Sequence, residues 1–87
     1  MNIKISDNVV WRDLEGEIVI LNLTSGVYFS VEGVGTRIWT LISEQVATED
    51  IIGKLISEFD VEESQLRSDV ESLVKDLTDQ GLIEVSG

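Results

Sequence analysis

The sequence contains no cysteine, no histidine and no proline. Without cysteine, no disulfide can stabilise the fold and no thiol can act as a nucleophile. Without histidine, the chain also lacks the commonest general base and the commonest metal ligand. The remaining acid–base groups are carboxylates, lysines and hydroxyls. We therefore expect a protein without enzymatic activity.

The acidic pairs and the glycines do not form a convincing cofactor or metal site either. Glu49-Asp50 and Glu62-Glu63 fit the first turns of helices, where the helix dipole favours negative charge. No stretch has the ligand spacing of an EF-hand loop. Gly33-x-Gly35 lacks the further glycine and the lysine of a phosphate-binding loop. The sequence predicts no cofactor and no metal ion.

Basic residues are scarce: six lysines and arginines stand against 17 acids, giving a net charge of −11. Residues 44–79 carry −8 of this charge, because only Lys54, Arg67 and Lys75 oppose eleven acids there. That half of the chain repels polyanions, so we expect no nucleic-acid binding. Two interpretations stay open, namely solvated helix faces or a surface that attracts a basic peptide.

Long apolar runs are absent too, and the first four residues lack the apolar core of a signal peptide. Hydrophobic residues nevertheless make up 43% of the chain, which argues against disorder. The 87 residues suffice for one small core. We expect a single domain over residues 1–87, cytoplasmic and not bound to a membrane.

The first third of the chain has the pattern of three strands. Residues 3–13 predict the first strand, which is best defined over Val9 to Asp13. Glu17 to Leu23 predicts a second, whose four consecutive apolar residues suit the centre of a meander. Thr24-Ser25-Gly26 is a hairpin loop, and Val27 to Val31 is the third strand.

The two outer strands of this meander differ in charge. The first strand carries charged residues that protect an edge against pairing, namely Lys4, Asp7, Arg12 and Asp13. The third strand, Val27 to Val31, carries none. Its main-chain groups form a template for an added strand. Alternatively, Leu82 to Val85 or a second copy of the chain covers this edge.

The rest of the chain has helical spacing. Glu32–Ser43 predicts a first helix with Trp39 beside its apolar face, and Thr48 caps a second helix that ends at about Phe59. Asp60 caps a third helix that Gly81 ends, before a short extended tail. The third helix has a long apolar stripe: Leu66, Val70, Leu73, Val74 and Leu77. The fold class is α+β, a winged-helix-like arrangement of a three-stranded antiparallel sheet followed by three helices.

Val19 to Val31, followed by Gly35-Thr36-Arg37-Ile38-Trp39, resembles the PqqD-like family. Asp69-Val70, Leu73, Leu77 and Gly81-Leu82-Ile83 resemble the end of its third helix. The resemblance covers nearly the whole chain, from about Val9 to Ile83. One departure is Val31-Glu32, where the family has Leu-Asn.

This resemblance implies a recognition element for precursors of ribosomally made, modified peptides. It implies that the leader peptide adds as a strand beside the third strand, against the third helix, the mode called β-augmentation. It further implies delivery of the leader to a processing enzyme. Among family members, the chain is most similar to the stand-alone leader-binding proteins of lasso-peptide biosynthesis, whose partner is a leader peptidase.

The residues expected to bind the leader lie on these two elements. The strand contributes Val27, Tyr28, Phe29, Ser30 and Val31, and the helix contributes Arg67, Asp69, Val70, Leu73, Val74, Asp76 and Leu77. For the apolar helix residues, a place in the core is favoured over a place in the pocket. The two aspartates are candidates either for pairing with leader Lys or Arg, or for solvated surface.

Other functions stay open at this point. One is the handling of another modified peptide, such as the quinone-cofactor precursor of the same family. Another is a structural module that dimerises through the uncharged edge, so the chain is expected to be a monomer or an edge-paired dimer. A small acidic enzyme subunit is the third.

Overall fold

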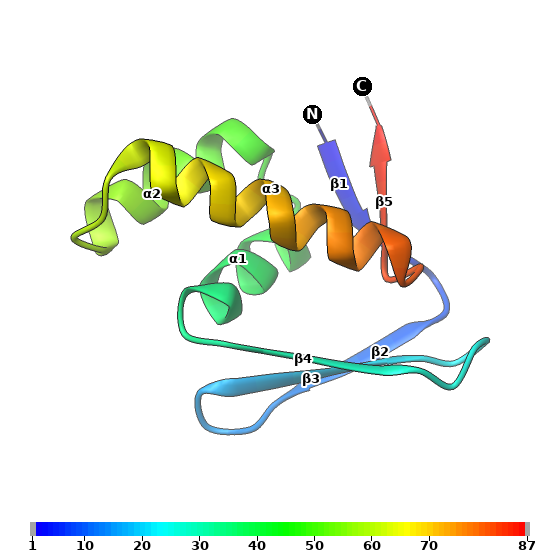
Figure 1. Cartoon of the computed structure of the whole chain (residues 1–87). Helices are drawn as coiled ribbons and strands as arrows, with labels where there is room; N and C mark the ends of the chain where they lie inside the picture. The colour runs from blue at the N-terminus through cyan, green and yellow to red at the C-terminus, as the bar shows by residue number, and fades with distance from the viewer. Residues whose placement is uncertain (1, 87) are drawn as a thin grey trace.

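The computed structural model describes residues 2–86, which form five strands and three helices (Figure 1). In chain order these are β1 (Asn2–Ile5), β2 (Val9–Asp13), β3 (Glu17–Asn22), β4 (Tyr28–Glu32), α1 (Val34–Ser43), α2 (Thr48–Glu58), α3 (Glu63–Asp79) and β5 (Ile83–Ser86). The expected α+β class, with a three-stranded antiparallel sheet and three helices, is confirmed. The winged-helix likeness stays a prediction, and residues 1 and 87 of the predicted domain lie outside the described range.

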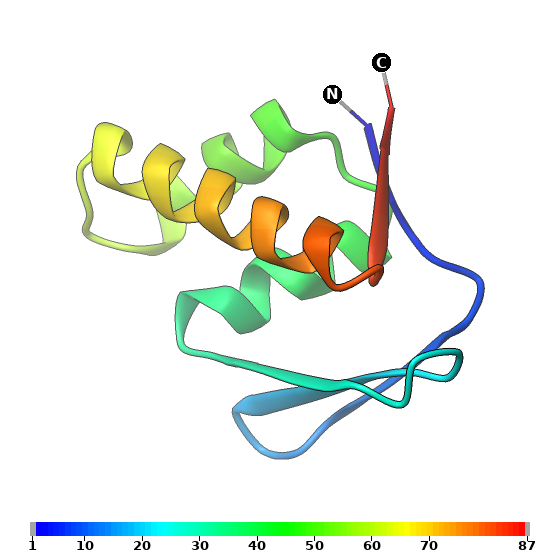
Figure 2. The same cartoon turned by 45° about the vertical axis from the view of Figure 1, so that its right-hand side comes forward.

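The three-stranded sheet has the order β2-β3-β4, with β3 in the centre as predicted. Ile18, Ile20 and Asn22 alternate along β3 as its buried residues. The register places Ile20 between Trp11 of β2 and Phe29 of β4. One face of the sheet therefore packs against the helices, which lie together on that side in Figures 1 and 2.

The prediction of a single strand over residues 3–13 was wrong in its first half. β1 is a separate strand that pairs antiparallel with β5, with Ile3 opposite Val85. A turn separates β1 from β2. Of the charged residues expected on the first strand, Lys4 therefore lies in β1 and Asp7 in the turn. Alternating apolar residues identify a strand but not its partner, which explains the error.

The alternative in which Leu82 to Val85 covers the edge of β4 was also wrong. Gly81, with φ +71°, ends α3 and redirects the chain. Leu82 and Ile83 are then buried, and β5 lies beside β1, so the two ends of the described chain are neighbours (Figures 1 and 2). Burial of these two side chains holds the tail on β1 and leaves the edge of β4 open.

Trp39 is at the centre of the core and not merely beside it. Its side chain is fully buried, together with Ile38 and Ile42 of α1. Its ring meets Trp11 edge to face, with centroids 6.0 Å apart and planes at 81°. This is a favourable aromatic geometry, and it connects α1 to the edge strand β2.

Two predicted helix starts were displaced. The residue before α2 is Ala47 and the residue before α3 is Glu62, and neither caps its helix with a side chain. Thr48 is instead a buried residue of α2. Asp60 does not cap α3, because the helix begins only at Glu63, after a tight turn over Asp60 in which the N–H of Val61 donates to the carbonyl of Phe59 at 3.0 Å. A capping-box pattern does not reveal this turn.

Candidate functional site

The outer edge of β4 is unpaired among residues 2–86, because β4 pairs with β3 alone. The backbone N–H of Asn22 donates to the carbonyl of Val27 at 3.0 Å, so these two residues form a hydrogen-bonded pair. In an antiparallel ladder such pairs alternate along the strands. Tyr28, Ser30 and Glu32 therefore direct their N–H and C=O groups to the open edge.

Helix α3 forms a second wall beside this edge. Gly35 of α1 lies where β4 and α3 converge: a Cβ on it would be 3.2 Å from Cβ of Val31 and 3.8 Å from Cδ2 of Leu73. The missing side chain lets the three elements approach closely, with α1 between β4 and α3 (Figure 2). Leu73 is only partly buried, so it is available to an apolar anchor of a bound peptide.

Acidic side chains lie along this side of α3. Asp69 and Asp76 are four residues before and three residues after Leu73, so they share its stripe of the helix. Asp69 accepts a hydrogen bond from Nε2 of Gln65 at 2.9 Å. Within residues 2–86, neither aspartate makes an ion pair. The wall opposite β4 therefore carries two carboxylates that form no ion pair within the described range.

Arg67 lies on the opposite flank of α3, toward α2. Its guanidinium contacts Glu49 at 3.1 Å and Glu63 at 3.4 Å. The hydrogen bond with Arg67 lowers the pKa of Glu49 and raises the pKa of Arg67. Val74 is on this flank as well, where it lines a hollow with Thr48 of α2. Arg67 and Val74 are thus separated from the open edge.

The other predicted residues divide between core and surface. Val70 and Leu77 are fully buried in the core. Phe29 and Val31 point toward the core, whereas Tyr28 is 69% exposed and Val27 is 40% exposed. The strand therefore offers its main chain and Tyr28 to a ligand.

One residue of the site was missed by the sequence reasoning. Glu32 was assigned to the first helix, although it is the last residue of β4 and has open main-chain groups. Gly35 was not missed in this way: a glycine in the first turn of a helix indicates a close approach of neighbouring elements, and the structure places it beside Val31 and Leu73.

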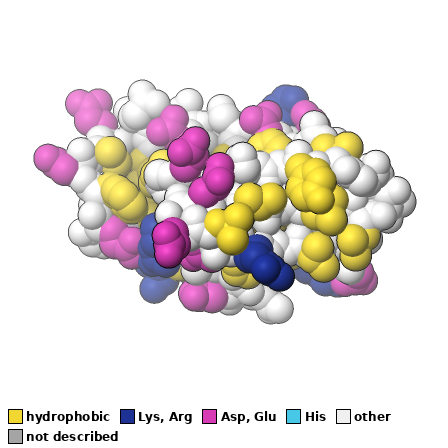
Figure 3. Space-filling view, turned by 90° about the horizontal axis from the view of Figure 1, so that it is seen from below, with side chains coloured by type: hydrophobic (Ala, Val, Ile, Leu, Met, Phe, Trp, Pro, Cys, Tyr) yellow, Lys and Arg dark blue, Asp and Glu magenta, His cyan; other side chains and the backbone are white. Residues whose placement is uncertain are grey.

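A separate apolar surface covers the outer face of the sheet, which Figure 3 shows from below as a cluster of hydrophobic side chains. It includes a shallow hollow lined by Val10, Trp11, Arg12, Leu14, Val19, Leu21 and Tyr28. The strand assignment did not distinguish the two faces of β3, so the outward positions of Val19 and Leu21 were not recognised. Tyr28 joins this surface to the open edge.

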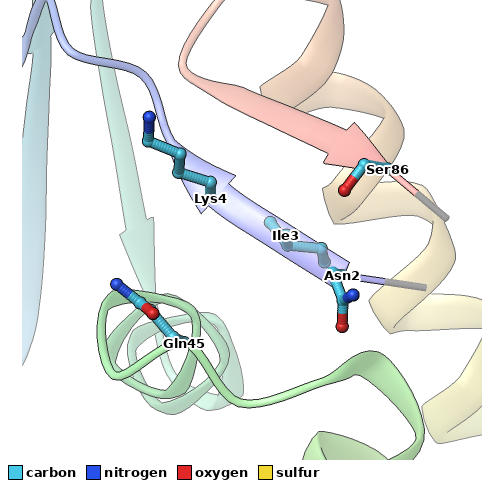
Figure 4. Close-up of a pocket in the computed structure, with 5 residues that line it drawn as sticks. All are labelled: Asn2, Ile3, Lys4, Gln45 and Ser86. Carbon is cyan, nitrogen blue, oxygen red and sulfur yellow. The ribbon is translucent and has the colours of Figure 1, made fainter.

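The third hollow lies at the ends of the chain, between β1 and the residues that follow α1 (Figure 4). Asn2, Ile3, Lys4, Gln45 and Ser86 line it. It contains one ionisable side chain, Lys4, and no carboxylate.

Within residues 2–86, no group of three or more Asp and Glu side chains is placed to hold a metal ion. No helix in this range is long and apolar enough to span a membrane.

The model of the family described as "Coenzyme PQQ synthesis protein D (PqqD)" matches residues 17–83. This chain belongs to the PqqD family. No curated protein matches the sequence. The match contains β3, β4 and all three helices, so it includes both walls of the candidate site. The resemblance to the PqqD family that the sequence indicated is confirmed.

Two solved structures resemble the whole fold. TbiB1 in complex with the TbiA(beta) leader peptide is 33% identical, with a TM-score of 0.91, covering 97% of this chain and 98% of that one. Lasso peptide synthetase B1 complexed with the leader peptide is 20% identical, with a TM-score of 0.87, covering 98% and 100%. The second likeness shows the fold alone. The first is a protein bound to a leader peptide and is similar to this chain over nearly its whole length.

Proposed function

We propose that this chain is a non-catalytic protein that binds the leader segment of a ribosomally made precursor peptide. The leader adds as a strand to β4, and the protein presents it to a processing enzyme, which in lasso-peptide biosynthesis is a leader peptidase. The observation that carries the proposal is the open edge of β4 beside the acidic flank of α3. The similarity to TbiB1, which is bound to a leader peptide, supports it.

The main-chain groups of Tyr28, Ser30 and Glu32 fix the register of the leader. Each such hydrogen bond contributes about 1 kcal/mol net, since it replaces one to water. Affinity must therefore come mainly from apolar leader side chains that bury against Leu73 and its neighbours. Asp69 and Asp76 favour a leader with Lys or Arg near these anchors.

The experiment is a backbone amide NMR titration with the synthetic leader of the precursor encoded beside this gene. We expect saturable shifts that centre on β4 and on the Leu73 stripe of α3. A folded protein whose amides do not shift at millimolar leader would overturn the proposal.

A second candidate function, edge-paired dimerisation, uses the same open strand. It would place β4 of one copy against β4 of another, with the same main-chain groups engaged. A molecular mass that rises with protein concentration, and falls when the leader is added, would indicate that the leader and a second copy of the chain compete for this edge. A constant monomer mass would exclude the dimer as the main function.

A further inference from the structure

Asn22, the last residue of β3, is a polar side chain buried at the sheet–helix interface, with 6% exposure. Its Oδ1 accepts hydrogen bonds from Nδ2 of Asn8 at 2.9 Å and from the backbone N–H groups of Thr24 at 2.9 Å and Ser25 at 3.1 Å. Its Nδ2 donates to the carbonyl of Gln80 at 3.1 Å. Both ends of one carboxamide are thus used, and they bind different parts of the fold.

The bond to Gln80 connects the sheet to α3. Gln80 is the residue at the C-terminus of α3, where carbonyl groups lack partners within the helix. Within residues 2–86, no other side-chain hydrogen bond joins the three-stranded sheet to α3. The adjacent Gly81 leaves room for this bond. A Cβ at that position would be only 3.1 Å from Nδ2 of Asn22.

Asn22 also determines where β4 begins. Its backbone N–H binds the carbonyl of Val27, directly before β4, and its side chain holds the loop at Thr24 and Ser25. An asparagine that only stabilised this loop would need its Oδ1 alone. The donated bond to Gln80, 58 residues away, adds a function that the loop does not require.

We propose that Asn22 is a positioning residue that sets the separation and relative orientation of β4 and α3, and thereby the affinity for the peptide between them. The middle of the groove is already fixed by Val31 and Leu73 over Gly35. Asn22 fixes the end where the hairpin meets the C-terminus of α3. The effect on affinity rests on the proposed function, whereas the effect on geometry does not.

Asn22→Asp is the decisive variant. It retains an acceptor for Asn8, Thr24 and Ser25, but a carboxylate cannot donate to the carbonyl of Gln80 and is repelled by it. We expect affinity for the synthetic leader to fall about tenfold. Residual dipolar couplings should show α3 rotated relative to the sheet. The added negative charge would by itself favour a basic leader, so it cannot explain a loss.

Asn8→Ala is the matched control, because it removes the bonds from Asn8 to Oδ1 of Asn22 and to Oγ1 of Thr24 and leaves the bond to Gln80. We expect its leader affinity to stay within about twofold of wild type, with unchanged couplings in α3. Both variants are compared at a temperature where thermal unfolding shows them to be fully folded. Equal affinity losses in the two variants would overturn the positioning role.

Gly81→Ala approaches the same contact from α3 without changing charge, and it provides the test if Asn22→Asp does not fold. Its Cβ meets Nδ2 of Asn22 and also strains the turn, because Gly81 has φ +71°. We expect a loss of affinity and a rotation of α3 in the same direction. Unchanged couplings in a folded variant would overturn the proposal, even if the wild type binds the leader. If α3 rotates in the variants but the wild-type protein binds no leader, the proposed function is refuted. The geometric role of Asn22 is retained in that case.

Discussion

The two flanks of α3 differ in how their charges are satisfied. Toward α2, Arg67 is held by Glu49 and Glu63, so acid and base neutralise each other within the chain. Toward β4, Asp69 and Asp76 share a stripe with Leu73 and make no ion pair among residues 2–86. One flank is closed by its own helix neighbour, and the other faces an open strand.

This difference distinguishes charges that are neutralised within the fold from charges that remain available to a ligand. Exposed ion pairs contribute little to stability, so the pairs on the α2 flank mainly remove charge that could attract a ligand. The acids beside β4 keep their field, and the low-dielectric floor of Val31 and Leu73 strengthens it. The same helix therefore packs against α2 on one flank and forms one side of the proposed peptide groove on the other.

The largest expected effect comes from Ser30→Pro, which removes an N–H from the open edge of β4. The ring replaces a donor that β3 does not use, so the fold should persist while an added strand is blocked. We expect leader affinity to fall at least about tenfold. Calorimetry of the leader titration measures this loss, and circular dichroism verifies the fold.

Asp13→Pro is the control on the opposite edge of the sheet. The hydrogen bond from Leu14 N–H to the carbonyl of Glu17 places Asp13 at a position whose own N–H faces away from β3. Leader binding should stay unchanged in this variant. If both proline variants bind equally well, the leader does not use the edge of β4.

A smaller effect is expected from Leu73→Ala compared with Val74→Ala. The two residues are adjacent in sequence, but Leu73 contacts the groove and Val74 lines the hollow toward α2. Both truncations should lower the free energy of unfolding by about 1–3 kcal/mol. Only Leu73→Ala should weaken leader binding, by about fivefold. Fluorescence titration and urea unfolding separate the two quantities, and equal affinities would remove Leu73 from the site.

The strands and helices of the groove could be predicted because their signals are local. The uncharged run from Val27 to Val31 indicated the edge strand, and the stripe of α3 indicated its amphipathic face. What could not be predicted depends on distant partners. The pairing of β5 with β1 and the burial of Trp39 against Trp11 link segments far apart in the chain.

The flank of α3 on which each residue lies also depends on distant partners and could not be predicted. Helical periodicity places Val70, Leu73 and Val74 on one broad apolar face, but only the positions of α2 and β4 divide that face. Arg67 was among the residues expected to bind the leader. Its partners on α2 place it elsewhere.

Charge reversal on the two flanks should have a still smaller and salt-dependent effect. Asp69→Lys places a positive charge beside β4, whereas Glu71→Lys makes the same change of net charge on the α2 flank. We expect Asp69→Lys to weaken a basic leader about threefold to tenfold at low salt, and less at high salt because screening shortens the interaction. Glu71→Lys should change affinity less than about twofold. Equal losses in both variants would mean that net charge alone attracts the leader.

The smallest effect concerns the closed flank and its response to acid. The hydrogen bond from Arg67 holds the pKa of Glu49 below its ordinary value of 4.5. A carboxylate with a lowered folded-state pKa contributes stability that is complete above the unfolded pKa and is lost as pH falls through the folded pKa. Arg67→Met should therefore slightly reduce the loss of stability below pH 4.5, measured as urea midpoints at neutral and acidic pH. Arg37→Met, which removes the analogous pair with Glu58, provides the comparison.

Leader affinity at neutral pH should be unchanged in Arg67→Met, because the pair lies away from β4. A clear loss of affinity there would instead return Arg67 to the binding site and show that the two flanks of α3 act as one surface.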